Sequence, residues 1–283
     1  MISYDTRRHW TNRIMTSLMF AATLIALIPL FFILNHLILK GFGSINFHFF
    51  TELPKPVGET GGGMANAMLG SLLLMSLACL IGLPFGLLGG IYLSEFGKNK
   101  WGNTVRFMAD MLNGTPSIVI GIFVYAIMVL PMKHFSALAG GVALGIMMIP
   151  TILRTTETMM LLVPQSLREG GLALGIPFWR TLLSIVFTTA RGGIMTGILL
   201  SIARISGETA PLLFTALGNQ FWAYNLNEPI SALPLQIFNY AISPFEEWHR
   251  QAWAGALVLI GFIFILNIAS QTLVKNSLTQ KRR

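Results

Sequence analysis

The chain has 283 residues, of which 54% are hydrophobic and only 11% are charged, and its formal net charge is +8. Soluble domains carry about 25% charged residues, so this composition excludes an ordinary soluble domain and favours a membrane protein. The single cysteine, Cys79, excludes a disulfide framework within one chain. The five histidines are scattered, with no pair at metal-ligand spacing, so the sequence predicts no metal site.

Six apolar stretches are long enough to cross a bilayer, which takes about 20 helical residues. They are residues 14–39, 66–93, 107–130, 135–153, 192–217 and 252–274. We therefore predict an all-α membrane protein with six transmembrane helices. The first stretch is longer than the apolar part of a signal peptide, about 7–15 residues, and lacks a good cleavage site, so we interpret it as an uncleaved anchor.

Positive charge lies mainly on one side of the predicted membrane. With a cytoplasmic N-terminus, the outside segments carry only Lys40, Lys55, Lys133 and Arg250. The inside segments carry fourteen basic residues: Arg7, Arg8, Arg13, Lys98, Lys100, Arg106, Arg154, Arg168, Arg180, Arg191, Lys275, Lys281, Arg282 and Arg283. This bias follows the positive-inside rule and predicts two cytoplasmic termini, which requires an even number of crossings. Basic residues in short loops also argue against a nucleic-acid partner.

The same pattern divides the chain into parts. Residues 1–13 are expected to be a cytoplasmic N-terminus, and 14–39 the first transmembrane helix. Residues 66–274 form a core of five helices with an inside loop at 155–191, and residues 275–283 form a basic cytoplasmic tail.

Two outside loops, 40–65 and 218–251, are long. The second holds Trp222, Tyr224 and Trp248, which indicate either an interfacial aromatic belt or a docking surface for an extracytoplasmic partner.

The inside loop contains a short helical pattern. Ser166 followed by Glu169 predicts a capping box, and Gly175 before Ile176-Pro177 predicts the end of this helix. One interpretation is an amphipathic helix at the membrane surface without a partner. The flanking Arg168 and Arg180 could contact another protein or lipid headgroups, and we favour lipid headgroups or solvent.

The spacing of Glu169, Gly175 and Ile185 resembles the cytoplasmic EAA loop of ABC-importer permeases. The sequence departs from that motif at Gly170 and Gly171, where alanines are usual, and at Phe187-Thr188, where Leu-Pro is usual. The resemblance implies a coupling helix that seats in the cytoplasmic ATPase. Its residues would be Glu169, Gly170, Gly171, Ala173, Leu174 and Gly175.

The fifth predicted helix carries Arg204 and Glu208, four residues apart and so on one face. Twelve residues past Gly192, Arg204 would lie about 18 Å along the helix, near the middle of the bilayer. A helical wheel places both charges on one stripe with the packing residues Gly193, Gly197 and Ser201, and with Pro211. This stripe indicates either a structural Arg–Glu pair or an anion path, because a guanidinium suits phosphate or sulfate oxygens.

The segment Ala203-Arg204-Ile205-Ser206-Gly207-Glu208-Thr209-Ala210-Pro211 resembles the permeases of Pst phosphate importers, specifically the PstA type. Residues 61–67, 89–95, 113–121, 154–157 and 195–200 resemble the same family. The resemblance implies a type I ABC importer permease fold and translocation of inorganic phosphate into a bacterial cytoplasm across the inner membrane. It also implies that Arg204, Glu208 and Arg154 serve the translocation path.

The implied partners are a PstC-type permease, a dimeric PstB-type ATPase, a PstS-type phosphate-binding protein and membrane lipid. The chain itself would bind no cofactor, and ATP and Mg would be used by the ATPase. Gly61-Gly62-Gly63 has no lysine at P-loop spacing, so it forms no nucleotide site. Two alternatives stay open: a permease for molybdate, sulfate or another anion, and an intramembrane enzyme using Arg204 and Glu208. The enzyme alternative is the weaker one, because the sequence shows no nucleophile motif and no metal motif.

Overall fold

The computed structural model describes residues 4–56, 58–59 and 61–279, and over these residues the chain is helical, with one isolated bridge between Leu217 and Ile230. The longer helices are α1 (Tyr4–Gly41), α3 (Ala65–Phe96), α4 (Lys100–Gly114), α5 (Ser117–Val124), α7 (Ala137–Leu161), α10 (Thr188–Ser206) and α13 (Glu246–Thr279). The shorter elements are η1 (Phe42–Ser44), α2 (Phe47–Thr51), η2 (Tyr125–Val129), α6 (Leu130–Met132), α8 (Gln165–Ala173), α9 (Phe178–Thr181), η3 (Leu182–Phe187), α11 (Ala210–Leu213) and α12 (Leu233–Ala241).

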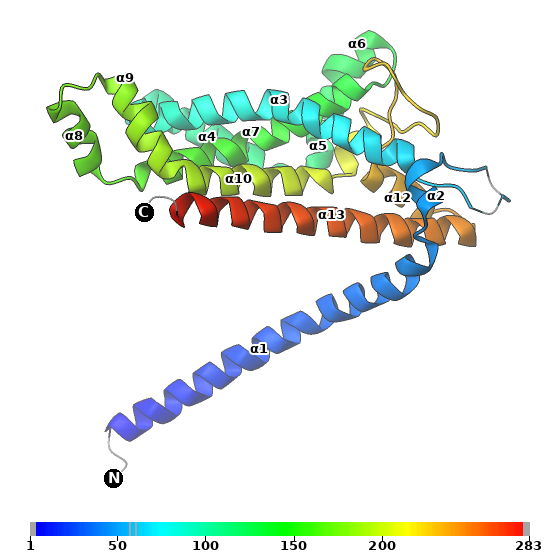
Figure 1. The fold of residues 1–283 in the computed structure, drawn as a ribbon, viewed down its shortest axis with the longest axis horizontal. Coiled ribbons are helices and arrows are strands. Elements are labelled where there is room, and N and C mark those ends of the chain that lie inside the picture. The colour runs from blue at the N-terminus through cyan, green and yellow to red at the C-terminus, as the bar shows by residue number, and fades with distance from the viewer. Residues whose placement is uncertain (1–3, 57, 60, 280–283) are drawn as a thin grey trace.

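Five helical spans are long and apolar enough to cross a membrane: α1, α3, α7, the continuous α9–η3–α10 and α13. A sixth follows if α4 and the helix over Ser117–Met132 count as one broken span. Helices α3, α7, α10 and α13 form a bundle, with α8 at one end and α2 and α12 at the other (Figure 1). The start of α1 and the end of α13 both lie toward the left of Figure 1, the side on which α8 lies, although the start of α1 is far from the bundle.

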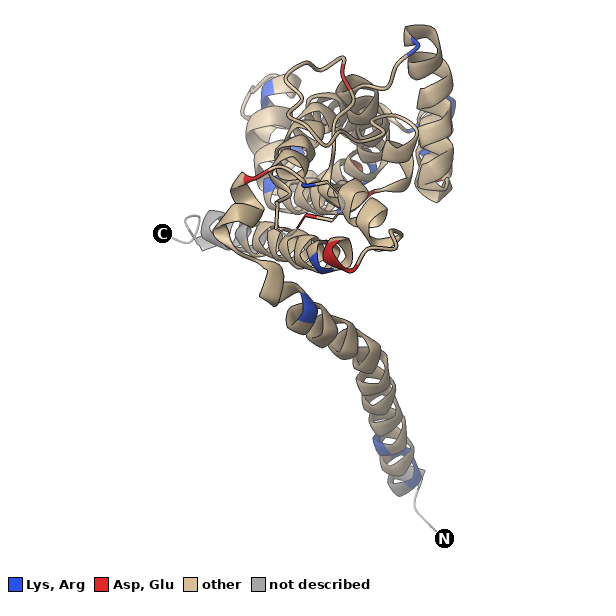
Figure 2. Ribbon diagram, turned by 90° about the vertical axis from the view of Figure 1, so that its right-hand side faces the viewer, with Lys and Arg blue, Asp and Glu red and all other residues tan. Residues whose placement is uncertain are grey.

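Helix α1 contacts the bundle only near its C-terminal end, where it packs against α13, and the rest of α1 projects away from the bundle (Figure 1). Near its end, the ring of His36 packs edge-on against Trp253 with centroids 5.0 Å apart. Figure 2 shows basic residues near both ends of α1 and none in its middle. The most apolar window of α1 has no buried residue, so its apolar surface needs lipid or another protein chain to cover it.

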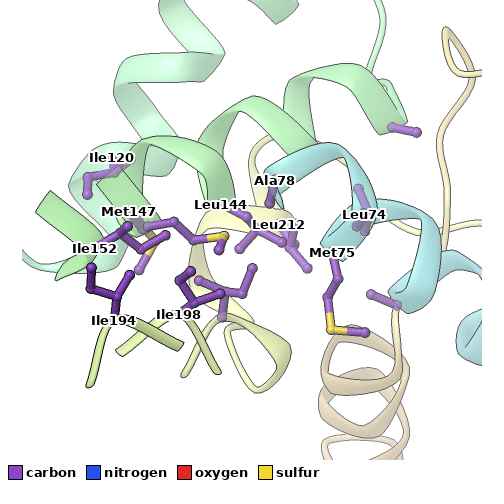
Figure 3. Close-up of a cluster of buried hydrophobic side chains, with 14 of the residues drawn as sticks. Leu74, Met75, Ala78, Ile120, Leu144, Met147, Ile152, Ile194, Ile198 and Leu212 are labelled. Carbon is purple, nitrogen blue, oxygen red and sulfur yellow. The ribbon is translucent and has the colours of Figure 1, made fainter. Parts of the chain in front are cut away.

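The centre of the bundle is a close contact between α3 and α7. Glycines 82, 86 and 90 of α3 face α7, and a Cβ at Gly86 would lie 2.7 Å from the Cβ of Ile152. Small residues allow helix backbones to approach closely without water. Around this contact, α3, α7 and α10 bury a cluster of aliphatic side chains that includes Leu74, Leu144 and Ile198 (Figure 3). This packing makes α3 and α7 one rigid unit.

The predicted third helix, 107–130, is wrong as a continuous element. The chain bends by 103° between Gly114 and Ser117. Pro116 has no backbone N–H to continue the ladder and disfavours a helical conformation for Thr115, which is extended at ψ 132°. The apolar composition runs through the bend, and for that reason a hydropathy argument cannot detect it.

The predicted fifth helix, 192–217, has both ends displaced. The span begins at Phe178, so the loop between the fourth and fifth spans is shorter than the predicted 155–191. The basic residues Arg180 and Arg191 lie inside the helix, where long side chains can still reach water at the membrane surface. The span ends at Ser206, because Gly207 terminates α10 before Pro211.

The segment after α10 forms the end of the bundle opposite α8 and holds the start of α7. The backbone N–H groups of Ser136, Ala137 and Leu138 donate to the carbonyl oxygens of Thr215, Glu228 and Leu226. Ser136 also caps α7 through its hydroxyl, which accepts from the N–H of Ala139 at 3.1 Å. These contacts satisfy donors that a helix start leaves unpaired.

Candidate translocation site and coupling segment

Arg204 lies near the end of the bundle opposite α8. It is the third residue from the end of the span Phe178–Ser206, about 39 Å along the helix from Phe178. The next residue, Ile205, is buried and lines a small cavity with Leu74 and Leu144, which belong to the outer parts of α3 and α7. The predicted distance of about 18 Å from the start of the helix is wrong, because that distance assumes a helix start at Gly192, whereas the span begins at Phe178.

The small residues of the predicted stripe on the fifth helix lie where α10 packs closely against α7. A Cβ at Gly193 would lie 2.2 Å from Met159 Sδ, and a Cβ at Gly197 would lie 2.2 Å from Thr155 Cγ2. Ser201 is 1% exposed. Arg204 follows on the same face of α10 but is exposed. The face of α10 that α7 covers at Gly193 and Gly197 is therefore uncovered at Arg204.

Glu208 does not share a helix with Arg204, because α10 ends at Ser206. In the described part of the chain, no ion pair or side-chain hydrogen bond joins these two residues (Arg204 is exposed and Glu208 half-buried). The alternative of a structural Arg–Glu pair is therefore wrong. Both charges remain available to a group outside this chain.

The break after α10 meets the break after α4. Gly121 of α5 packs against α11, and a Cβ at Gly121 would lie 2.6 Å from Pro211 Cα. The two short helices that follow the interruptions, α5 and α11, therefore pack against each other. Non-helical backbone at membrane depth is tolerated only where protein covers it or where it lines a water-filled cavity. Arg204 and Glu208 flank one of these breaks.

Arg154 lies in an intramolecular network between α7 and α4. Its Nη1 lies 2.8 Å from Glu157 Oε2 and its Nε lies 3.1 Å from Asp110 Oδ1. Glu157 is 2% exposed and also accepts from Arg106 Nε at 2.5 Å. Two guanidinium groups and two carboxylates thus compensate one another. The role of Arg154 in the translocation path stays a prediction.

A third polar contact, from the Thr151 hydroxyl to Asn113 Oδ1 at 3.2 Å, extends this network. Asp110 and Asn113 both lie in the second half of α4. The signal that sequence reasoning missed is their spacing with Arg106. These three residues recur at helical intervals and so share one polar face.

The coupling segment consists of α8 and the turn that follows it. Glu169, Gly170, Ala173 and Leu174 are exposed, whereas Gly171 is buried. A Cβ at Gly171 would lie 2.8 Å from Thr181 Cγ2, whereas a Cβ at Gly170 would meet nothing within 4 Å. The two glycines that replace the usual alanines therefore have different environments.

Gly175 ends the coupling helix as the sequence predicts. It has φ +74°, its N–H donates to the Leu172 carbonyl, and the N–H of Ile176 donates to the Gly171 carbonyl. These two bonds form a Schellman motif, which favours glycine. The predicted capping box is wrong, because Pro164 is the N-cap residue and Ser166 lies inside α8.

The prediction that Arg168 contacts lipid headgroups is also wrong. Its guanidinium pairs with Glu95 at the end of α3, and both side chains are largely shielded from solvent. Arg180 is exposed. The two arginines that flank the coupling segment therefore differ, and only Arg168 attaches this segment to the bundle through an ion pair.

The outer loop presents aromatic residues. Phe221 is 72% exposed and Tyr224 is 90% exposed, whereas Trp248 stacks on the buried Tyr240 with ring centroids 4.6 Å apart. Over the described residues, no group of three or more His, Cys, Asp or Glu side chains could hold a metal ion. The exposed rings fit both interpretations of this loop, an interfacial belt or a docking surface.

Comparison with known proteins identifies the family. The family model "Binding-protein-dependent transport system inner membrane component" matches residues 82–278. The phosphate transport system permease protein PstA of Yersinia pestis is 48% identical over 94% of this chain and 90% of its own length. PstA of Pasteurella multocida is 47% identical over 92% of this chain and 93% of its own length.

The chain belongs to the PstA-type permeases. Among solved structures, the methionine ABC transporter MetNI in an inward-facing conformation covers 76% of this chain and 94% of its own, with a TM-score of 0.59 and 17% identity. This likeness confirms the predicted type I ABC importer permease fold.

Membership in this family confirms several predictions. The chain is a multi-pass membrane protein and a transport component rather than an enzyme, which rejects the intramembrane-enzyme alternative. Permeases of this family work with a binding protein and an ATPase.

Proposed function

We propose that this permease forms part of the path through which an ATP-driven importer moves inorganic phosphate into the cytoplasm. The observation that carries the proposal is the state of Arg204. Arg106, Arg154 and Arg168 are each paired with a carboxylate of the same chain. Within the described residues, Arg204 has no such partner. Its guanidinium is left to meet an anion from outside the chain.

The relatives at 48% and 47% identity are named as phosphate transport permeases, which supports phosphate as the anion over molybdate or sulfate. The partners in this proposal are a PstC-type permease, a dimeric PstB-type ATPase and a PstS-type binding protein. The second permease would cover the exposed side of Arg204 and Glu208. The chain supplies no nucleotide site in this scheme, and ATP and Mg are used by the ATPase.

The orientation in this proposal is that of the positive-inside rule in a bacterial inner membrane. Both termini and α8 face the cytoplasm, and residues 218–231 face outward. The exposed α8 then meets the ATPase, and the exposed rings of Phe221 and Tyr224 lie on the side from which the binding protein delivers phosphate.

The test is ATP-driven phosphate uptake by the complete transporter in vesicles. Arg204→Gln is expected to lower the uptake rate by about a hundredfold, since a charge-assisted contact to the anion is lost. Arg191→Gln is the matched control, because Arg191 lies exposed on the same helix without an ion pair among the described residues, and should retain most uptake. Normal uptake by Arg204→Gln would reject this site, and molybdate or sulfate uptake in preference to phosphate would reject the substrate.

A further inference from the structure

The inner end of α3 is a junction of several elements. Arg106 of α4 donates to the carbonyl oxygens of Leu93 at 3.2 Å and Gly97 at 2.8 Å, two acceptors at the end of α3. Phe96 of α3 packs edge-on against Phe178, the first residue of α9, with ring centroids 5.9 Å apart. The end of α3 is therefore fixed to α4 and to the helix that follows the coupling segment.

Arg168 joins the coupling helix α8 to this junction. Its Nη1 pairs with Glu95 Oε1 in the last turn of α3, and its Nη2 donates to the carbonyl oxygen of Met160, at the end of α7, at 2.8 Å. The side chains of Arg168 and Glu95 are 13% and 7% exposed. The planar fork of the guanidinium thus binds α3 in one direction and α7 in the other.

Arg168 is the only residue of α8 with this kind of attachment in the part of the chain that the structure describes. All side-chain hydrogen bonds and ion pairs from α8 to α3 and α7 come from it. Gly171 packs against Thr181 and Ile185, which follow α8 closely along the chain. The exposed side of α8, with Glu169 and Leu174, remains free for another protein.

We propose that the Arg168–Glu95 ion pair is the attachment through which α8 moves the inner ends of α3 and α7 when the ATPase changes conformation. The inference rests on the proposed function. With the pair formed, α8 and the end of α3 move together, and the glycine contact between α3 and α7 carries the displacement into the bundle. Without it, the movement of α8 is only weakly passed to α3, and more ATP is hydrolysed for each phosphate moved. Both are positioning residues.

The experiment measures phosphate transported per ATP hydrolysed by the complete transporter in proteoliposomes. In Arg168→Gln and Glu95→Gln this ratio is expected to fall about tenfold, in the range of coupling energies between residues in contact. In the charge-swapped variant, Arg168→Glu with Glu95→Arg, it should recover by more than half. Lys98→Gln is the control, because Lys98 is exposed three residues from Glu95 and its loss should leave the ratio unchanged.

The ratio separates coupling from mere stability, because it is measured only on transporters that have assembled. A wild-type ratio in both single variants would overturn the inference, and so would a swapped variant as defective as the single ones. If the unmodified transporter moves no phosphate, the proposed function fails instead. Stimulation of ATP hydrolysis by the loaded binding protein then decides the inference: lost stimulation in the variants supports it, and retained stimulation overturns it.

A second arm covers variants that do not assemble. Cysteines placed at 95 and 168 in a Cys79→Ser background are joined by a cleavable bifunctional thiol reagent. The joined protein is expected to couple hydrolysis to phosphate movement, and cleavage of the linker in the same preparation should lower the ratio. Equal ratios before and after cleavage would overturn the inference.

Discussion

At the scale of single residues, the space for a side chain is smallest at glycines where two backbone segments are in contact. Gly70, in the second turn of α3, lies against the backbone of the outer loop. A Cβ at this position would lie 1.9 Å from the carbonyl oxygen of Ser231. The same loop is held by Ser71, whose hydroxyl accepts from the N–H of Leu233 at 2.7 Å. The position therefore sets how closely the loop approaches α3.

We expect Gly70→Ala to destabilise the purified transporter by about 1–3 kcal/mol, because the loop must move to make room for the methyl group. The melting temperature of the detergent-solubilised complex measures this. Gly43→Ala is the matched control, since a Cβ at Gly43 would meet nothing within 4 Å. Equal melting temperatures for the two variants would contradict the close approach.

At the scale of elements, the polar contact between α4 and α7 explains how a bent span is held. Arg106 and Asp110 pair with Glu157 and Arg154, and every charge of the four has an opposite charge within reach. Apolar packing alone would leave α4 free to slide along α7, because aliphatic contacts are not directional. The paired charges fix its register before the chain turns at Pro116.

The two carboxylates of this network should differ in their contribution to stability. Glu157→Gln leaves two guanidinium groups with one remaining carboxylate at a site that is 2% exposed, and we expect a loss of about 3 kcal/mol. Asp110→Asn removes a pair whose side chains are 53% and 38% exposed, and we expect a loss below about 1 kcal/mol. Chemical unfolding of the purified complex gives both values, and the opposite order would refute the network as described.

At the scale of the whole molecule, the two ends of the bundle expose different segments of the chain. Helix α8 lies at one end and the loop with Tyr224 at the other (Figure 1). Leu174 is 81% exposed and Tyr224 is 90% exposed, so a reagent can reach both if it is on the correct side. The arrangement therefore gives a direct test of orientation.

In a Cys79→Ser background, we expect Tyr224→Cys to react with a membrane-impermeant maleimide in intact cells. Leu174→Cys should react only in inverted vesicles stripped of the ATPase. Mass spectrometry of the labelled chain measures the extent of reaction at each cysteine. Reaction of both variants from the same side would contradict an odd number of crossings between these positions.

The features of this structure that the sequence predicts are those that depend on residues close together in the chain. The second span, predicted at 66–93, is observed at Ala65–Phe96, because a run of apolar residues is a local property. The helix ends at Gly114 and Ser206 were not predicted, since apolar residues continue past both. The pair of Arg168 with Glu95, separated by 73 residues, depends on tertiary packing and has no local signal.

The two helix breaks, after α4 and after α10, affect how stable the protein is against degradation before it assembles with other subunits. Gly114, Pro116 and Gly207 are exposed at these breaks, so in a lone permease this backbone has no protein cover. A backbone polar group left unsatisfied in hydrocarbon costs several kcal/mol. We therefore expect a copy without the other transporter subunits to be degraded by membrane proteases. Cells that make this chain without the rest of the transporter should contain little of it, and pulse-chase half-lives with and without the other subunits measure the difference.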